Sequence, residues 1–522
     1  MKKAFLFFCI IFICYLNLSA QTWMKTYNSM NSDANYVIEN YDKGYIILGN
    51  RVDQKYGWII KTDINGNILW NKKLGNGNYL IFPKNIERTP DNGYIIGGTT
   101  TEIKNQQDAF LMKLNSCGEV DWCTINYTAS VSYDLGWNVK PIPTGGYILL
   151  GMLNDPIHRI HLFRFDNNGY LLWHQFYLPD SLLFDENSFK LLIDTDGFII
   201  TGYGFYPDPG QSDGWQRPYF IKTDTSGNPI WKLVYVGNNY YHGNGSFSLV
   251  SPSGNYYCAG RHYRVDGDSP ALIKYFHNGQ HSYNADLISN SYLGLVVNVV
   301  QKDDTTLIFS GAWAIPGVSS PVGLIKSDTM GNVIKTKQFY SNYGELVNST
   351  AKTFDNKFIS VMTHCSGSTC AIYAYKVNSN LEYDSIYTQP FTYDSLCPYP
   401  IVSDTLDLNC ITVGIEEPQA YDETTKLKVY PNPASQKLTL EFPKYLVVNT
   451  SGAGVQSTVI YHQWNSTILE AYNLFGRQVY SKEIPKTQDK LEMNISGWQP
   501  GMYLFRLVYQ KRTAASVKVV IQ

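Results

Sequence analysis

The chain has 522 residues, a length at which more than one domain is expected. Its 42 Lys and Arg nearly balance its 44 Asp and Glu, so it lacks the excess positive charge that draws a protein to nucleic acid or to an anionic membrane. Aromatic residues make up 15% and charged residues only 16%, and no long stretch has helical apolar periodicity, so we predict an all-β protein.

Residues 1–20 have the pattern of a secretory signal peptide. Lys2 and Lys3 precede an apolar core over residues 4–16, and the small residues before Gln21 suit a cleavage site. The core is shorter than the ~20 residues that a membrane span needs. We therefore expect export and a mature chain that begins at Gln21, with no transmembrane segment in it.

A repeated unit begins with residues 42–74. One apolar run ends at Gly49, and a second is followed by a polar turn that contains Asn65-Gly66, a strong hairpin signal. A third run is centred on Trp70. The unit recurs about every fifty residues, a period typical of propeller blades.

Seven copies of this unit can be followed over residues 21–387. The first four have a Trp in the last apolar run, at Trp70, Trp122, Trp173 and Trp231, and the later copies are less regular. Each copy supplies four short strands, and blades packed around an axis bury faces that one blade cannot cover alone. The sequence therefore predicts a seven-bladed β-propeller.

The ring of blades needs a closing strand, and two segments are candidates. Residues 22–27 resemble the strand that contains Trp70 and precede any complete copy, so we expect them to pair into the last blade. Residues 382–387 could instead supply an outer strand within the seventh copy.

The exported chain is expected to form disulfides, because it meets oxidising conditions. Two of the nine cysteines lie in the predicted signal peptide. Short sequence spacing predicts three bonds and leaves Cys258 as a buried thiol. The predicted bonds join Cys117 to Cys123, Cys365 to Cys370 and Cys397 to Cys410. These spacings do not match a zinc site.

No residue is assigned a catalytic, cofactor-binding or metal-binding role, and no cofactor is predicted, because no motif for such a site is found. Asp63 and Asp166 begin turns that resemble fragments of a calcium loop, but the terminal Glu of such a loop is missing. We interpret these residues as turn formers. The recurring Asp-x-x-Gly-x-x-x-Trp pattern resembles the repeats of quinoprotein-type propellers and the Asp-box of sialidases, and this resemblance extends to blade construction only.

The carboxy-terminal part of the chain differs in pattern. Residues 388–425 are rich in Pro, Asp and Thr and are predicted to be a linker. Residues 426–522 contain short strand patterns at close spacing, which predict a small immunoglobulin-like β-sandwich.

Ordered turn motifs in this last region resemble the type A sorting domain of the type IX secretion system. The residues that carry the resemblance include Tyr430, Pro431, Asn432, Pro433, Gly476, Pro500, Gly501 and Tyr503. Residues 445–466 are longer than the usual joint of that family. The resemblance implies export by the general pathway, passage across the outer membrane with the type IX secretion machinery as partner, and a final place at the cell surface or in the medium.

Two main functions are compatible with these features. The first is a binding module for an unidentified glycan or protein. The second is a secreted polysaccharide-active hydrolase or lyase with its site at the mouth of the propeller channel. Two carboxylates, or a His with Tyr and Arg, gathered at one end of the channel would favour the enzyme, and we lean towards binding. A purely structural surface protein would show no pocket.

Overall fold

The computed structural model describes most of residues 22–522, and residues 1–21, with the predicted signal peptide, lie outside the described residues. Short segments are also outside the description, namely residues 28–30, 52–54, 104–105, 129–132, 155–157, 178–185, 208–213, 235–244, 252–253, 265–266, 280, 289–290, 292, 315–321, 341–346, 367–368, 416–426, 443–444, 451–455, 462–466, 475–476, 486–487 and 510–511. The elements in the described residues are all strands, which confirms the all-β prediction. Within them no helix has the length and apolar character that crossing a membrane requires.

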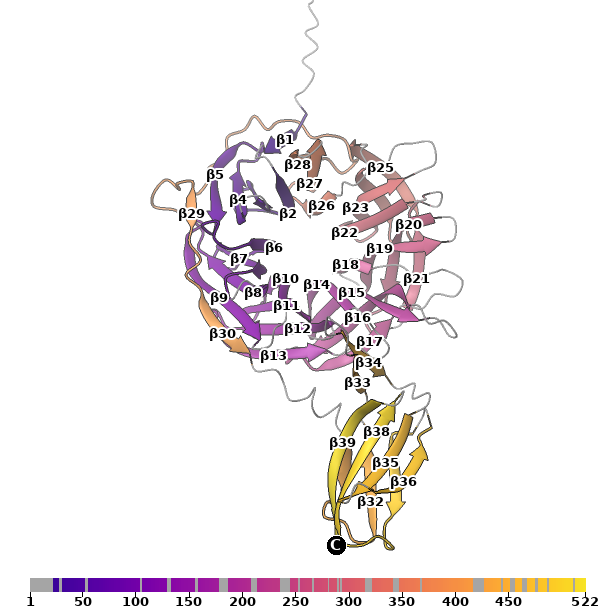
Figure 1. The fold of residues 1–522 in the computed structure, drawn as a ribbon. Helices are drawn as coiled ribbons and strands as arrows, with labels where there is room; N and C mark the ends of the chain where they lie inside the picture. The colour runs from indigo at the N-terminus through magenta and orange to yellow at the C-terminus, as the bar shows by residue number, and fades with distance from the viewer. Residues whose placement is uncertain are drawn as a thin grey trace, which may run out of the picture.

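Seven sheets, each with four antiparallel strands, form a ring in which the strand at the inner end of each sheet faces the centre (Figure 1). Six of these sets are consecutive in the chain, and the seventh takes its outer strand from the amino terminus. The strands, from the inside outwards in each sheet, are β2 (Ser32–Glu39), β3 (Tyr45–Arg51), β4 (Tyr56–Thr62) and β5 (Ile68–Leu74); β6 (Ile81–Arg88), β7 (Tyr94–Thr100), β8 (Asp108–Leu114) and β9 (Val120–Thr128); β10 (Tyr133–Pro141), β11 (Tyr147–Asn154), β12 (His158–Phe165) and β13 (Leu171–Tyr177); β14 (Glu186–Asp194), β15 (Gly197–Pro207), β16 (Gly214–Asp224) and β17 (Pro229–Val234); β18 (Gly245–Val250), β19 (Tyr256–Arg264), β20 (Gly267–Tyr275) and β21 (His281–Asp286); β22 (Leu293–Asp303), β23 (Thr306–Ala314), β24 (Val322–Asp328) and β25 (Val333–Tyr340); and β26 (Val347–Lys352), β27 (Phe358–Ser366), β28 (Thr369–Val377) and β1 (Met24–Tyr27).

The amino-terminal strand closes the ring. β1 pairs antiparallel with β28, with Met24 opposite Tyr375 and Tyr27 opposite Ile372, so the last sheet takes its outer strand from the start of the chain. This pairing confirms residues 22–27 as the closing strand. Residues 382–387 form only isolated bridges, such as the one between Thr22 and Ser385, and do not supply the outer strand.

Neighbouring sheets meet through a repeated contact between a tryptophan and a glycine. The Trp lies on or beside the outer strand of one sheet, and the Gly lies in the hairpin turn of the next sheet. A Cβ atom added to Gly66 would lie 2.8 Å from the ring of Trp23, and one added to Gly169 would lie 2.5 Å from Trp122. The same contact joins Trp70 to Gly118, Trp173 to Gly227 and Trp231 to Gly279. Only a glycine allows the ring to approach the backbone this closely.

The inner strands carry a second repeated feature, a β-bulge. The register of each inner strand against its neighbour shifts by one residue, which leaves one residue unpaired. The bulge residues are Asn35, Lys84, Trp137, Phe189, Ser246, Val297 and Asn348. They are 49 to 57 residues apart in the sequence, close to the period of the repeat.

The residue after the bulge often bonds to the next sheet. Asn85 accepts a hydrogen bond from the Val139 amide (2.6 Å) and donates one to the Val139 carbonyl (3.2 Å). Asn138 accepts one from the Leu191 amide (3.2 Å). Buried amide side chains need such partners, so these bonds fix the inner strands relative to one another.

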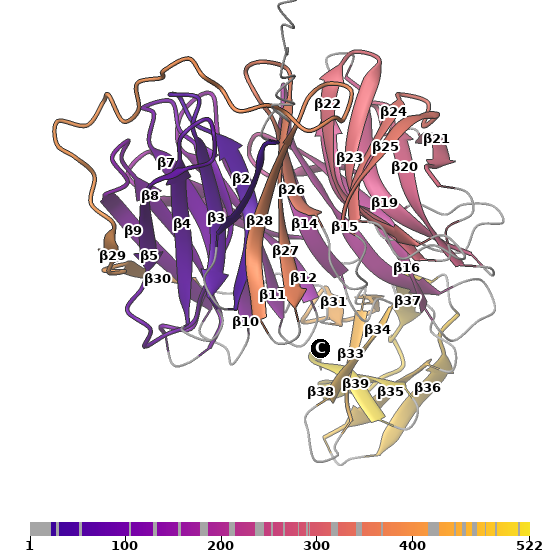
Figure 2. The same ribbon diagram turned by 90° about the horizontal axis from the view of Figure 1, so that it is seen from above.

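Residues 387–415, here called the strap, cross from the last sheet over the first two sheets (Figure 2). The strap contains β29 (Asp404–Leu406), which pairs parallel with β5, and β30 (Ile411–Ile415), which pairs parallel with β9. Lys72 forms an ion pair with Asp404 (2.7 Å). The predicted linker is therefore ordered against the propeller sheets over this part of its length.

Two of the three predicted disulfide bonds are wrong. Cys117 is bonded to Cys397 and Cys123 to Cys410, whereas Cys365 is bonded to Cys370 as the spacing predicts. Cys117 lies in the turn between β8 and β9, and Cys123 lies opposite Met112 within the hairpin, so the two thiols do not face each other. The strap brings the distant cysteines beside them.

The carboxy-terminal region forms a separate group of strands around its own apolar core. One sheet has the order β31-β32-β37 and another β36-β35-β38-β39, with a hairpin of β33 and β34 beside them. Core residues from both sheets include Leu438, Leu491, Leu469 and Phe505. The strands are β31 (Lys428–Tyr430), β32 (Lys437–Glu441), β33 (Tyr445–Thr450), β34 (Gln456–Tyr461), β35 (Thr467–Asn473), β36 (Gln478–Glu483), β37 (Lys490–Asn494), β38 (Gly501–Tyr509) and β39 (Arg512–Ile521).

The Trp–Gly contact can be tested at Gly169. Gly169→Ala adds a Cβ against Trp122 at a residue with a φ of 82°, and we expect it to destabilise the protein by about 2–4 kcal/mol. Gly254→Ala is the matched control, because its φ of 74° is similar but the nearest atom lies 3.8 Å away, and backbone strain alone should cost about 1–2 kcal/mol. Denaturant unfolding followed by tryptophan fluorescence measures both. Equal losses would show that the tryptophan contact contributes nothing.

Candidate functional site

A cavity of about 240 Å³ lies among the inner strands of the ring. It is lined by residues of β2, β6, β10, β14, β22 and β26, so the sheets share one site. The lining residues are Ala34, Asn35, Tyr36, Lys84, Asn85, Trp137, Asn138, Lys190, Val297 and Asn348.

The bulges explain why these side chains meet. A bulge leaves one residue out of the pairing and redirects its side chain. Five bulge residues line the cavity, and they are of four different types, namely Asn35, Lys84, Trp137, Val297 and Asn348. The β-bulge thus repeats in the inner strands around the ring, whereas the type of side chain at the bulge varies from sheet to sheet.

Lys84 is held over an aromatic ring. Its ammonium lies 4.9 Å from the centre of the Trp137 ring, a cation–π geometry. Burial lowers the pKa of Lys84 by more than the nearby charge of Asp33 raises it. Burial likewise raises the pKa of Asp33, against the hydrogen bond of Asn50 and the charge of Lys84. The charged form of Lys84 would therefore gain from a further anion.

Lys190 also lines the cavity and is held over an aromatic ring in a similar way. Its ammonium lies 4.8 Å from the centre of the Tyr36 ring and donates to the Tyr36 hydroxyl (3.2 Å). That hydroxyl donates to Glu87 (3.3 Å), which also forms an ion pair with Lys140. Lys190 comes from β14 and Tyr36 from β2, so this contact spans the ring.

The amides of the cavity are held in place by the backbone. Asn35 donates to the Pro83 carbonyl and to the Asn50 side-chain oxygen, both at 2.7 Å, and Asn348 donates to the Ala34 carbonyl and to the Thr363 hydroxyl (3.4 Å). An amide side chain has two donor hydrogens and an acceptor oxygen, so these bonds engage the donor side of both amides. The cavity therefore combines two ammonium groups, two aromatic rings and fixed amides, and none of the described residues that line it is acidic.

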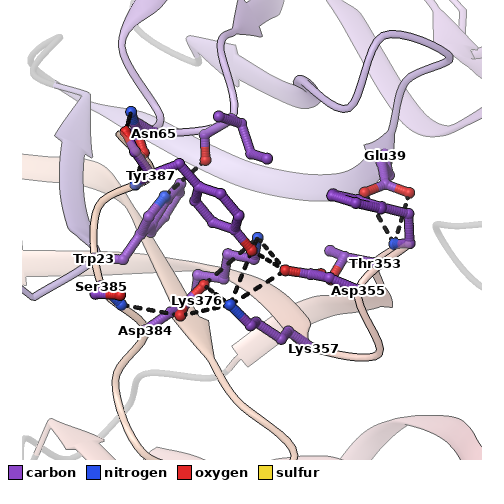
Figure 3. A network of polar contacts seen from close by, with 12 residues as sticks. Trp23, Glu39, Asn65, Thr353, Asp355, Lys357, Lys376, Asp384, Ser385 and Tyr387 are labelled. Carbon is purple, nitrogen blue, oxygen red and sulfur yellow. Dashed lines mark hydrogen bonds and ion pairs between the residues drawn. The ribbon is translucent and has the colours of Figure 1, made fainter. Parts of the chain in front are cut away.

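A second polar cluster lies where the ring closes (Figure 3). Lys376 is fully buried and lies within 3.4 Å of Asp355 and 3.6 Å of Asp384, and Lys357 contacts the same two carboxylates. The Tyr387 hydroxyl, at the start of the strap, bonds to Asp355 and accepts from both lysines. Positive and negative groups balance here, so the cluster stabilises the closure and offers little to a ligand.

A third cluster has metal-ligand chemistry but is occupied by a lysine. Asp194, Asp196 and His277 place oxygen and nitrogen atoms within 4.8 Å of one another. The Lys222 ammonium forms ion pairs with both carboxylates, at 2.5 Å for Asp194. The Tyr256 hydroxyl donates to Asp194, so these carboxylates are engaged in a partly exposed ion-pair network around the buried Lys222.

The turn aspartates behave as turn formers. The Asp63 carboxylate accepts hydrogen bonds from the amides of Asn65 and Asn67, both at 2.8 Å, within its own turn. Asp166 accepts equivalent bonds from Asn168 and Tyr170. The carboxylates that suggested calcium are thus used by the backbone of the turn.

The sorting-motif residues lie at two places in the carboxy-terminal strands. Tyr430, Pro431, Asn432 and Pro433 lie at the end of β31 and in the turn after it, where the Asn432 amide bonds to the backbone of Lys518 and Val520 on β39. Pro500, Gly501 and Tyr503 line a surface hollow of about 570 Å³ at the start of β38, and the Tyr503 hydroxyl donates to the Gln499 carbonyl. Gly476 lies outside the described residues.

The cavity residues were not identified from the sequence. The only signal for them was the upstream run that opens each copy of the repeat, in which the bulge residues recur at the repeat spacing. Because the residue type changes at every copy, the position does not stand out as a motif.

Comparison with known proteins matches the end of the chain to a family model. Residues 428–522 match the model of the secretion system C-terminal sorting domain. No curated protein matches the chain.

Solved structures resemble the propeller part in outline. A polysaccharide lyase, an ulvan lyase, bound to a -[GlcA(1-4)Rha3S]- ligand, is 9% identical over 68% of this chain and 96% of its own, with a TM-score of 0.48. The β-propeller domain of the trilobed protease from Pyrococcus furiosus is 9% identical over 69% and 99%, with a TM-score of 0.41. An α-L-arabinofuranosidase of Fusarium graminearum is 12% identical over 59% and 94%, with a TM-score of 0.38.

The polar cluster at the ring closure, which contains Asp355, makes the free energy of unfolding depend on pH in the acid range. Burial raises the pKa of Asp355, but the hydrogen bond from Thr353 and the charges of Lys376 and Lys357 outweigh it and lower the pKa overall. The stabilisation is therefore present above the ordinary Asp pKa of about 3.9 and is lost as the pH falls through the lower folded value.

We expect Asp355→Asn to be less stable than the wild type at neutral pH and to lose less stability on acidification. Asp407→Asn, at an exposed residue of the strap, should keep the wild-type pH dependence of the thermal midpoint. Identical profiles for Asp355→Asn and wild type would contradict this role.

Proposed function

We propose that this protein is an exported binding module whose ligand site is the cavity among the inner strands. In this proposal the seven sheets are the blades of a seven-bladed propeller over residues 21–387. Residues 388–425 connect it to an immunoglobulin-like sorting domain at residues 426–522, and residues 1–20 are the signal peptide. The unidentified ligand is a glycan or a protein.

Export rests on the carboxy-terminal match. The secretion system C-terminal sorting domain at residues 428–522 indicates that the chain is exported and is secreted or attached at the cell surface. In this proposal the chain interacts with the secretion machinery during its export. The disulfide bonds of the structure agree with an oxidising compartment, since three are present among the described residues.

Binding is supported by the composition of the cavity. Lys84, Lys190, Tyr36 and Trp137 supply charge and flat apolar surface within one concave site, which is typical of ligand pockets. The catalytic sets that would favour an enzyme, two carboxylates or His with Tyr and Arg, do not occur among its described lining residues. This composition is the observation that carries the proposal.

A polysaccharide-active lyase or hydrolase is the second candidate. One contact favours it, because the Tyr36 hydroxyl lies between Lys190 and Glu87, where a proton could be exchanged with a bound substrate. Cleavage of a bound glycan by the wild type, lost in Tyr36→Phe, would replace the binding proposal by this one.

The export proposal predicts the behaviour of a truncated chain. A stop codon after Thr425 removes the sorting domain but keeps both disulfide bonds of the strap. The strap therefore stays covalently joined to the second sheet of the propeller part. We expect the truncated protein to remain inside the outer membrane of a host with a type IX system, while the full chain reaches the surface or the medium. Cell fractionation and immunoblotting measure this, and normal export of the truncated chain would show that the domain does not direct sorting.

The binding proposal predicts that filling the cavity removes the ligand. Val297→Phe adds a ring at a residue that lines the cavity, whereas Val333→Phe makes the same change on the outer strand β25. Ligands of the mature chain are first identified by glycan array or pull-down. We expect Val297→Phe to weaken their binding at least about tenfold, about 1.4 kcal/mol, and Val333→Phe to leave it unchanged. Both variants should keep the wild-type circular dichroism and thermal midpoint. Ligands that bind all three proteins equally would place the site elsewhere.

A further inference from the structure

The strap crosses the junction at which the ring closes. The backbone of its first residue, Tyr387, exchanges two hydrogen bonds with the Asn65 side chain of the first sheet (2.7 and 2.9 Å). The hydroxyl of the same tyrosine bonds to Asp355 of the last sheet (Figure 3). Further along the strap, the Tyr393 hydroxyl accepts a hydrogen bond from the Ile64 amide of the first sheet (2.9 Å). The strap therefore connects the last sheet to the first.

The far part of the strap is joined covalently to the second sheet. Cys397 is bonded to Cys117, in the turn before β9, and Cys410 is bonded to Cys123, on β9. With the first of these bonds, the chain from Cys117 to Cys397 becomes a closed covalent loop. This loop contains the outer strand of the second sheet and the chain through the third to the last sheets, and the strap completes it by passing over the first sheet.

The contacts across the junction itself, among the described residues, are non-covalent. On the outside they include the four residues of β1 on β28. On the inside, Asn348 donates to the Ala34 carbonyl, and the Ala34 amide donates to the Thr363 hydroxyl (3.0 Å). The Val37 amide donates to the Ser349 hydroxyl (3.4 Å). Ala34 and Asn348 also line the cavity, so opening of this junction would remove part of the cavity wall.

The strap buries little of its own apolar surface, so its disulfide bonds matter for its attachment. Its side chains Leu396, Tyr399, Val402 and Ile411 are 50% to 80% exposed. Its strands β29 and β30 have three and five residues and pair in parallel, the slightly weaker arrangement per residue. A disulfide bond excludes open conformations that such weak contacts would allow.

From this connectivity we propose that the strap is a redox-dependent lock. Its two disulfide bonds hold the ring closed where the first and last sheets meet, and their reduction lets this junction and one wall of the cavity open. Each bond forms when two cysteine thiols give two electrons and two protons to a disulfide oxidant, which becomes two thiols. Cys117 and Cys397 are partly exposed, so a reagent can reach this bond. The lock is independent of what the cavity binds.

Hydrogen exchange followed by peptide mass spectrometry measures the opening of the junction. The mature chain, residues 21–522, is compared with a variant that combines Cys397→Ser with Cys410→Ser, and with the wild type reduced by dithiothreitol. We expect amides of β1 and β2 to exchange at least about tenfold faster in the variant and in the reduced protein, because these strands lie at the junction. Amides of β11, in the third sheet, should keep the wild-type rate.

A control variant distinguishes the strap bonds from any disulfide bond. Cys365→Ser combined with Cys370→Ser removes the bond within the hairpin of β27 and β28, and β1 should then exchange as in the wild type. The same acceleration in this control would overturn the assignment to the strap.

Two further outcomes would overturn the lock. The first is an unchanged exchange rate of β1 and β2 in both the strap variant and the reduced protein. The second is an equal acceleration in β11, which would show that the strap bonds stabilise the whole ring and not its closure.

Discussion

Five of the seven junctions between the sheets of the ring share one close contact, a tryptophan ring against the backbone of a glycine in the next sheet. The contact is made by Trp23 and Gly66 at the closure and recurs between successive sheets as far as Trp231 and Gly279. Each such contact sets the distance and angle between two sheets, because neither a rigid ring nor a glycine backbone can yield. The first contact also fixes the amino terminus, since Trp23 donates from its indole nitrogen to the Ile64 carbonyl (2.8 Å).

The β-bulges of the inner strands repeat in the same way, and they form the lining of the cavity. With the sheets held at a fixed spacing, five of the bulges in the inner strands place a residue in the lining of the cavity. The residues after the bulges, such as Asn85 and Asn138, bond the inner strands together, and the bulge residues Asn35 and Asn348 add hydrogen bonds to the next sheet. The repeated sheets thus place different side chains at equivalent positions around the centre. In this way a fold built from repeats forms a cavity with a lining of its own.

The strap shows the limit of local reasoning. Residues 387–415 carry no strong strand signal, yet they add a parallel strand to each of two sheets and place Cys397 and Cys410 beside Cys117 and Cys123. Exposed sheet edges accept such strands readily. The spacing of cysteines predicted only the Cys365–Cys370 bond, where both residues belong to one hairpin.

The sequence by itself determined the features that are local and repeated: strands, the Asn65-Gly66 turn, the closing strand at residues 22–27 and the sorting motifs of the last hundred residues. These depend on contacts between near neighbours or on a period that one can read along the chain. Only the tertiary structure decided the strap, the long-range disulfides and the cavity. Lys190 meets Tyr36 across 154 residues, and no local pattern records a contact that exists only when the ring has closed.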